Sequence, residues 1–168
     1  MKLLLSLALT CFAFAAAAQQ TTTLSKPAYS IKYPSAWTVD ASTDAKQFTI
    51  KAPADSGIVD TYVENLNMVI NQLTSPYTAE EYAKFSKNYL PQKIKQFVVL
   101  ENKKGNFAGK DSWFMVFKGL QLGKKLQWKQ YYIVQNGKVH ILTFTAEVFR
   151  YKEYIKTVNT MLATYVAK

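Results

Sequence analysis

The chain has almost none of the residues on which nucleophilic and zinc-dependent catalysis depend. Its 168 residues include one cysteine, Cys11, and one histidine, His140. A nucleophile needs a neighbouring base and a zinc site needs several His or Cys ligands, so both kinds of site are nearly excluded. His140 could act as a general base, but its apolar strand favours a structural role with locally satisfied ring nitrogens. We therefore expect no catalytic residue, no metal and no cofactor.

Glycine is also scarce, and its six copies are too dispersed to form a phosphate-binding loop. Three acids, Asp55, Asp60 and Glu64, lie close together across a turn and could hold a hard cation through their oxygens. The glycine-spaced loop of a dedicated calcium site is missing, which favours the interpretation that these are solvated turn acids.

Long apolar runs are absent except at the N-terminus. Residues 1–18 combine an early Lys2, an apolar stretch and a small-residue end, which predicts a secretory signal peptide cleaved between Ala18 and Gln19. A retained anchor is the alternative. Cleavage would remove Cys11 and leave a thiol-free mature chain without disulfides. No later segment has the roughly 20 apolar residues of a membrane span. We expect a protein that is exported to the periplasm or secreted.

The strongest pattern in the mature chain is at residues 137–146, where a glycine turn leads into a strand that is apolar or Thr on both faces. Such a strand is expected at the centre of a sheet. Asn136-Gly137 before it predicts a tight hairpin with the preceding strand. A second hairpin is expected around residues 122–124, and Trp37 is expected in the core.

Two helices are expected. Thr78 and Glu81 form a capping-box pattern for the first, whose residues Tyr82, Phe85 and Tyr89 share one face, and Pro91 ends or kinks it. The second covers about residues 151–165. Residues 19–27 are expected to be a flexible leader, and residues 28–168 a single domain. Hairpin connections and doubly apolar strands predict an α+β fold, with an antiparallel sheet of about six strands flanked by helices on both faces.

Four segments resemble the PsbP-like and DcrB-like proteins: residues 29–37 (YSIKYPSAW), 48–53 (FTIKAP), 64–69 (ENLNMV) and 137–146 (GKVHILTFTA). Their order spans nearly the whole mature chain. The resemblance implies an α/β/α sandwich around a central antiparallel sheet. Family members include an extrinsic photosystem subunit, a Ran-binding import factor and exported bacterial proteins. The resemblance implies a non-enzymatic, partner-binding domain, although a shared fold does not transfer a function.

The positive charge is concentrated in the second half of the chain. Residues 101–168 contain twelve Lys or Arg and four acids, and the net charge of the whole chain is +10. Many exported proteins are simply basic, but such an excess also favours anionic partners. Lysines surround two tryptophans, Trp113 and Trp128, in a pattern that could form a docking face. The candidate residues of this face are Lys103, Lys104, Lys110, Lys118, Lys124, Lys125, Lys129 and Trp128. The alternative is that the tryptophans are core residues and the lysines are solvated.

Two functional classes follow. The first is a monomeric, non-enzymatic domain that docks on a protein or an anionic envelope surface. The second is a small-ligand carrier or hydrolase-type enzyme with a pocket between sheet and helix, whose polar candidates are Asp111, Tyr131, Tyr132 and His140. Nucleic-acid binding is not expected, because nearly all the basic residues are lysines and no reader motif accompanies them.

Overall fold

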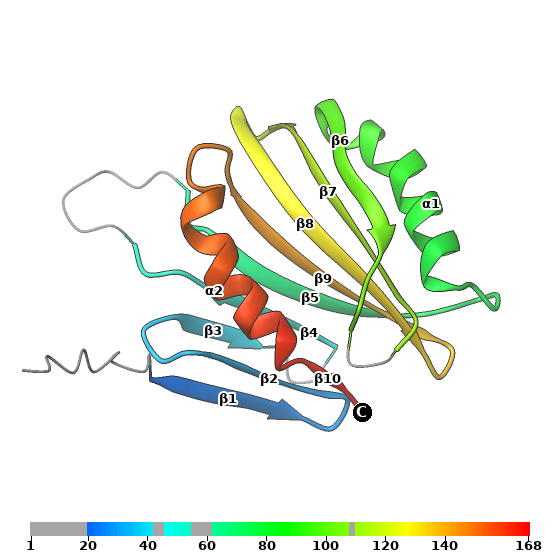
Figure 1. The fold of residues 1–168 in the computed structure, drawn as a ribbon, viewed down its shortest axis with the longest axis horizontal. Coiled ribbons are helices and arrows are strands. Elements are labelled where there is room, and N and C mark those ends of the chain that lie inside the picture. The colour runs from blue at the N-terminus through cyan, green and yellow to red at the C-terminus, as the bar shows by residue number, and fades with distance from the viewer. Residues whose placement is uncertain (1–19, 42–45, 55–61, 108–109) are drawn as a thin grey trace, which may run out of the picture.

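The computed structural model describes residues 20–41, 46–54, 62–107 and 110–168. The predicted signal peptide, with its cleavage site at Ala18 and Gln19, lies outside the described residues. In the described part of the chain, the first five strands precede the first helix, the next four lie between the helical segments, and one short strand follows the last helix (Figure 1). The strands are β1 (Thr21–Lys26), β2 (Tyr29–Pro34), β3 (Thr38–Ala41), β4 (Gln47–Lys51), β5 (Asn65–Gln72), β6 (Lys95–Lys104), β7 (Ser112–Gln121), β8 (Lys124–Gln135), β9 (Lys138–Glu147) and β10 (Val166–Ala167). The helices are α1 (Ala79–Tyr89), the short 3-10 helix η1 (Leu90–Gln92) and α2 (Tyr151–Ala163).

β9 is the central strand of the larger sheet, as predicted. The strand order is β3-β4-β5-β9-β8-β7-β6, and every neighbouring pair is antiparallel. Asn136 and Gly137 turn β8 into β9 with φ of 52° and 69°, the left-handed backbone that a two-residue hairpin turn needs. Within the described residues this sheet has seven strands where about six were predicted.

A second, three-stranded sheet has the order β1-β2-β10. β1 pairs with β2 along its whole length, from Thr21 opposite Pro34 to Lys26 opposite Tyr29. The prediction of a flexible leader at residues 19–27 is therefore wrong. β-Branched threonines suit a strand even when they are exposed, and Leu24 adds a contact with the hydrophobic core.

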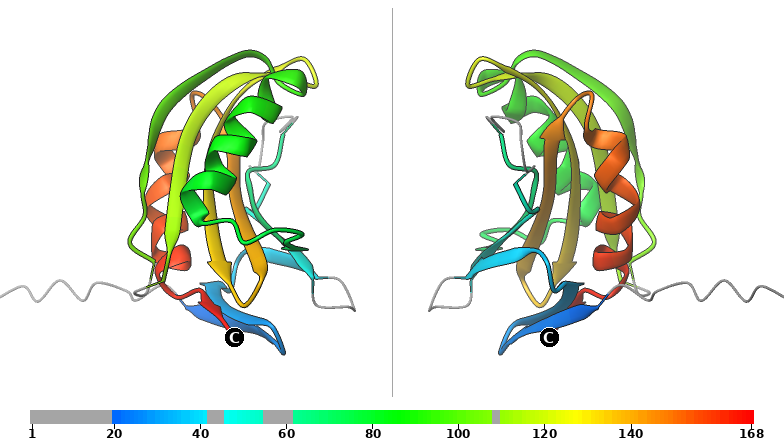
Figure 2. Two further views of the ribbon diagram at one scale, coloured as in Figure 1. Left: turned by 90° about the vertical axis from the view of Figure 1, so that its right-hand side faces the viewer. Right: turned by 90° about the vertical axis from the view of Figure 1, so that its left-hand side faces the viewer.

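Two hydrophobic cores lie on opposite faces of the larger sheet. On one face, α2 and the smaller sheet pack on β9, with Tyr29, Phe144 and Val158 among the buried residues. On the other face, α1 packs on β7 and β8, with Phe117 and Trp128 among the buried residues. The two helices are seen on either side of the sheet in Figure 2. Trp37 is buried against Tyr154, as predicted.

Helix α1 begins at the predicted capping box. Thr78 caps it, and the reciprocal hydrogen bonds with Glu81 complete the capping box. Its buried residues are Ala79 and Ala83, whereas Phe85 is 57% exposed and Tyr89 is also exposed. Of the three aromatic residues expected on one face, Tyr82 contacts Tyr132 of the sheet, with ring centroids 5.7 Å apart, and the other two are exposed. The sheet beneath presents large side chains, so the small Ala83 allows the helix to approach it closely.

Candidate functional site

The alternation of side chains in β7 and β8 divides the predicted basic face into separate groups. Trp128 points to the α1 side of the sheet, where its ring stacks on Phe117 at 5.2 Å between centroids and is buried. Its assignment to a docking face is therefore wrong. Lys125 and Lys129 are odd-numbered in the same strand and point to the α2 side. The same alternation is visible in the sequence and would have separated Trp128 from these lysines.

Two further residues of the predicted docking face, Lys104 and Lys110, do not lie with the other lysines. Lys104 lies opposite Trp113 in the β6–β7 register, on the α1 side of the sheet. The ammonium of Lys110 donates to the side chain of Gln135 and, at 2.7 Å, to the carbonyl of Ala167. Through these bonds Lys110 joins the end of β8 to the C-terminal strand, so its role is structural.

Three candidates gather at the turn between β7 and β8, which we call the basic turn region. Lys118 and Lys125 are exposed and line one hollow of about 270 Å³ together with Val98 and Val148. Lys124 lies 3.5 Å from the carboxylate of Glu147 and is partly buried. The backbone N–H of Val148 donates to the carbonyl of Lys125 at 3.0 Å, which fixes the turn before α2 beside this hairpin.

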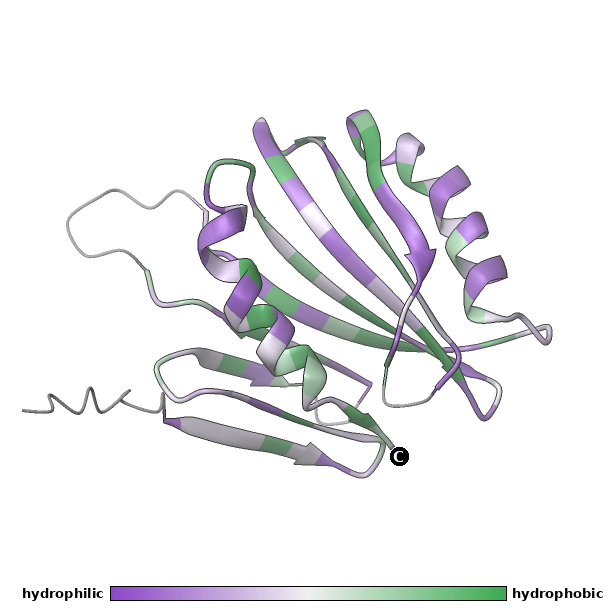
Figure 3. Cartoon of the chain, viewed as in Figure 1, coloured by the Kyte–Doolittle hydropathy of each residue, from purple (hydrophilic) through white to green (hydrophobic). Residues whose placement is uncertain are grey.

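Apolar side chains protrude from the basic turn region. Leu122, at the tip of the β7–β8 turn, is 88% exposed, and Phe149, in the turn between β9 and α2, is 74% exposed. Figure 3 shows the hydrophobic character of the turn that leads into α2. Leu122 has a φ of 52°, a left-handed conformation that costs a leucine about 1 kcal/mol or more. Exposed apolar residues in strained backbone are typical of binding surfaces.

Lys103 and Lys129 form a second group, further along the same face of the sheet. Their ammonium groups lie 5.4 and 5.0 Å from the ring centroid of Phe114, and that of Lys129 lies 5.2 Å from the ring centroid of Tyr131. Lys103 is paired with Glu101 at 2.9 Å. Lys129 donates to the amide oxygen of Asn159 on α2 at 3.0 Å. Burial lowers the pKa of Lys129. The negative charge of Glu101 raises this pKa and the positive charge of Lys103 lowers it, both by less than burial does.

A cavity of about 500 Å³ lies beside Lys129, between β8 and the C-terminal half of α2. Its lining residues are Asn106, Phe107, Lys129, Tyr131, Asn159, Leu162 and Ala163. The cavity is therefore partly apolar, with one cation and two side-chain amides. It lies between sheet and helix, where a pocket was predicted, and Tyr131 is the member of the predicted polar set that lines it.

The other three members of that set lie elsewhere. Tyr132 is buried on the α1 side of the sheet, and burial raises its pKa above the usual value. Asp111 accepts the backbone N–H of Ala79 at 2.9 Å at the start of α1. Because these side chains do not converge, the predicted hydrolase-type arrangement of Asp111, Tyr131, Tyr132 and His140 is wrong.

His140 has the structural role that the sequence favoured. Its side chain is buried, and Nδ1 shares a hydrogen bond of 2.6 Å with the hydroxyl of Tyr165. Burial, and then the positive charges of Lys110 and Lys138, lower its pKa from 6.5 to about 4. The ring is therefore neutral at physiological pH and is engaged by the C-terminal segment.

Glu64 is likewise part of the fold. It is buried, and its carboxylate lies 3.9 Å from the guanidinium of Arg150 and accepts the backbone N–H of Glu147 at 3.4 Å. Asp55 and Asp60, its partners in the hypothetical cation site, lie outside the described residues. Among the residues that are described, no three His, Cys, Asp or Glu side chains gather as metal ligands.

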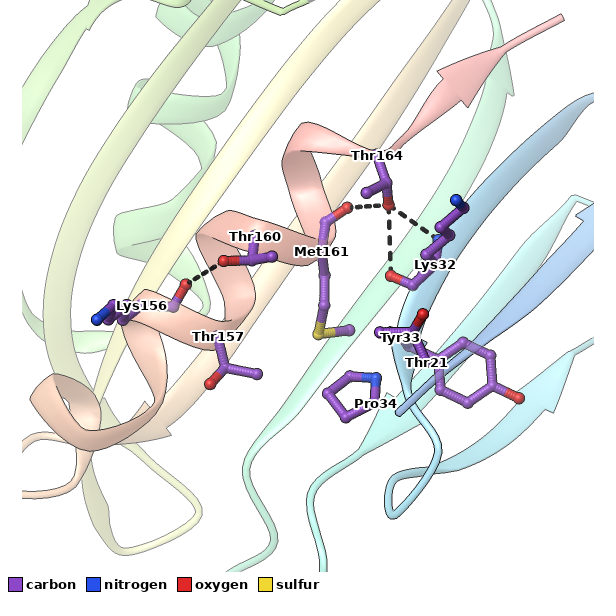
Figure 4. Close-up of a pocket in the computed structure, with 9 residues that line it drawn as sticks. All are labelled: Thr21, Lys32, Tyr33, Pro34, Lys156, Thr157, Thr160, Met161 and Thr164. Carbon is purple, nitrogen blue, oxygen red and sulfur yellow. Dashed lines mark hydrogen bonds between the residues drawn. The ribbon is translucent and has the colours of Figure 1, made fainter. Parts of the chain in front are cut away.

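A smaller hollow, of about 220 Å³, lies between β2 and α2 (Figure 4). Met161 and Pro34 face it, whereas the ammonium groups of Lys32 and Lys156 point away from it. Thr164 closes one end, where its hydroxyl oxygen accepts the backbone N–H of Lys32 at 2.9 Å and lies 2.6 Å from the carbonyl oxygen of Met161. No helix in the described part of the chain has the length and apolarity to cross a bilayer.

Comparison with known proteins gives a fold and no closer relationship. No protein-family model and no curated protein sequence matches the chain. Among solved structures, a protein of unknown function from Pseudomonas aeruginosa, PA94, described as a putative regulator, is 16% identical with a TM-score of 0.66, over 88% of this chain and 97% of that one. LpqN of Mycobacterium tuberculosis, described as involved in cell envelope biogenesis, is 16% identical with a TM-score of 0.66, over 88% and 90%.

The third similar structure is a PsbP protein, the kind of protein that four segments of the sequence resemble. Cyanobacterial PsbP from Synechocystis is 14% identical with a TM-score of 0.63, over 94% of this chain and 98% of that one. Structural similarity at such low sequence identity shows that the fold is shared, and it leaves the activity of this protein open. The α+β fold of this protein, with its antiparallel sheets and two helices, is PsbP-like.

Proposed function

We propose that this protein is an exported, non-catalytic domain that docks on an anionic envelope surface through its basic turn region. The domain is an α/β/α sandwich of the PsbP-like kind, and it begins at β1 instead of residue 28. Export is supported by the signal-peptide pattern of residues 1–18. LpqN, which has a similar fold, is described as involved in cell envelope biogenesis.

The observation that carries the proposal is the combination of protruding apolar and basic side chains at one turn. Leu122 and Phe149 extend into solvent, and Lys118 and Lys125 lie beside them. A lysine close to an anionic membrane contributes about 1 kcal/mol, and full burial of a leucine or phenylalanine about 1.5–3 kcal/mol. Neither the attraction of the lysines nor the burial of the apolar side chains is sufficient for membrane binding alone. Together they give reversible binding to a membrane that has anionic headgroups above an apolar interior.

Lys95 adds to this charge. It is exposed and lies opposite Leu120 in the β6–β7 register, close to the same turn. Glu147, at the end of β9, is paired with Lys124 at 3.5 Å and is largely covered. Lipid headgroups are a better fit than a folded protein, because the protruding residues belong to two narrow turns and not to a broad flat patch.

The test is cosedimentation of the protein, purified after export, with vesicles of phosphatidylcholine alone or mixed with phosphatidylglycerol. We expect binding only to the anionic vesicles, weakened by salt. A double variant, Lys118→Glu with Lys125→Glu, should bind at least 10-fold more weakly. The matched control, Lys84→Glu with Lys87→Glu, makes the same charge change on α1, on the other side of the sheet.

Equal losses in the two double variants would contradict the proposal, since net charge and not the basic turn region would then control binding. Binding that is indifferent to both salt and lipid charge would also contradict it. If vesicles do not bind but in-cell crosslinking through the turn captures an acidic envelope protein, docking stands and the lipid surface is wrong.

A further inference from the structure

The cavity between β8 and α2 has a built aromatic wall. The rings of Phe107 and Tyr131 meet edge to face, with centroids 5.4 Å apart, and Phe107 makes a second such contact with the buried Tyr165. Leu162 and Ala163 supply the apolar surface from α2. A ring or a short acyl chain would find hydrophobic contacts on both sides of a space of about 500 Å³, which is within the usual range for small-molecule sites.

One cation borders this cavity without an ionic partner among the described residues. An ammonium has three donors, and Lys129 directs one to Asn159 at 3.0 Å. The rings of Phe114 and Tyr131 provide further attraction, but rings do not accept hydrogen bonds as a carboxylate does. The nearby acid, Glu101, is 2.9 Å from the ammonium of Lys103. Lys129 is half-buried, so its charge is poorly compensated by solvent.

We propose that this cavity binds a small organic anion, with its carboxylate at Lys129 and an aromatic or short acyl body between Phe107 and Leu162. The carboxylate would take the free donors of the ammonium, and the amides of Asn106 and Asn159 could donate to its remaining lone pairs. The site is separate from the basic turn region and does not depend on docking. The pKa of Lys129 is lowered in the same direction, since partial burial disfavours the charged form by more than the charge of Glu101 favours it.

Three probes separate the parts of the proposal. Phenylacetate carries both the ring and the carboxylate, phenylacetamide has the same ring without the charge, and inorganic phosphate has the charge without the ring. Titration followed by NMR of the protein purified after export should show saturable binding of phenylacetate, at least 5-fold tighter than either other probe. The shifted signals should include the side-chain amide of Asn159 and the ring of Tyr131.

Two variants and one control test the residues. Lys129→Gln should weaken phenylacetate binding at least 10-fold while the melting temperature shows that the fold persists. Ala163→Phe should fill the space from α2 and abolish binding without removing a charge. Lys118→Gln removes the same charge from the same face of the sheet, outside the cavity, and should leave phenylacetate affinity within 2-fold of the wild type.

Several results would overturn the assignment. Equal affinity for phenylacetamide would show that Lys129 plays no part, and equal affinity for phosphate would show that the aromatic wall plays none. Unchanged binding in the Lys129→Gln variant, or an equal loss in the Lys118→Gln variant, would show attraction by the general surface charge. A direct measurement completes the test: a bound carboxylate should raise the pKa of Lys129, observed at its side-chain carbons.

Discussion

Nδ1 of His140 and the hydroxyl of Tyr165 share a hydrogen bond of 2.6 Å inside the protein. The bond joins the central strand β9 to the segment between α2 and β10, which itself pairs with β2. Burial raises the pKa of Tyr165 and lowers that of His140. Both groups are therefore neutral over the physiological range, and protonation of the histidine would place a charge in a buried position at the contact that holds the C-terminal segment to the sheet.

Stability should fall as the pH falls from 6.5 to about 4. In the unfolded chain the histidine pKa is near 6.5, and in the folded protein it is about 4, so the unfolded state binds more protons in this window. The contribution is complete above pH 6.5 and is lost towards pH 4, on the order of 3 kcal/mol in total. Urea unfolding at several pH values should show that His140→Phe removes this component, since the chain has a single histidine. An identical pH slope in the variant would refute the assignment.

Replacing Leu122 by asparagine should stabilise the protein and weaken surface docking. Asparagine tolerates the left-handed backbone that Leu122 adopts, with a φ of 52°, so relief of strain should contribute about 0.5–1 kcal/mol. The same change removes the most exposed apolar side chain of the basic turn region. Thermal unfolding and vesicle cosedimentation measure the two effects. A control at the equivalent hairpin, Asn136→Leu, should destabilise the protein and leave vesicle binding unchanged, and the idea fails if Leu122→Asn binds vesicles as the wild type does.

Helix α1 should tolerate changes to its exposed aromatic residues better than changes to its buried alanines. Phe85 is largely exposed, so Phe85→Ser should alter the free energy of unfolding by less than about 1 kcal/mol. Ala83 is fully buried among large side chains of the sheet, and Ala83→Leu should cost about 1–3 kcal/mol through overpacking. Chemical denaturation of the two variants checks this. The opposite ranking would mean that Phe85 packs into the core and that Ala83 does not limit the fit of the helix.

Local patterns in the sequence determined the features that depend on short-range forces. The Asn136-Gly137 turn, the capping box of Thr78 and Glu81, and the central position of β9 could all be read from a few neighbouring residues. Backbone conformation at a turn, hydrogen bonding at a helix end and a strand that is apolar on both faces are fixed locally. The single histidine and the thiol-free mature chain that cleavage would leave follow from composition alone.

Only the tertiary structure decided which surfaces are covered. Thr21–Lys26 is a strand because β2 offers it an edge, and that partner cannot be inferred from a mostly exposed segment. Tyr82 of α1 contacts Tyr132 in the sheet, whereas Phe85 and Tyr89 are exposed, because only part of the aromatic face lies over β8. Lys129 faces a cavity because α2 crosses the sheet beside it and brings Asn159 within 3.0 Å. Each of these results depends on contacts between segments far apart in the chain, where packing overrides local preference.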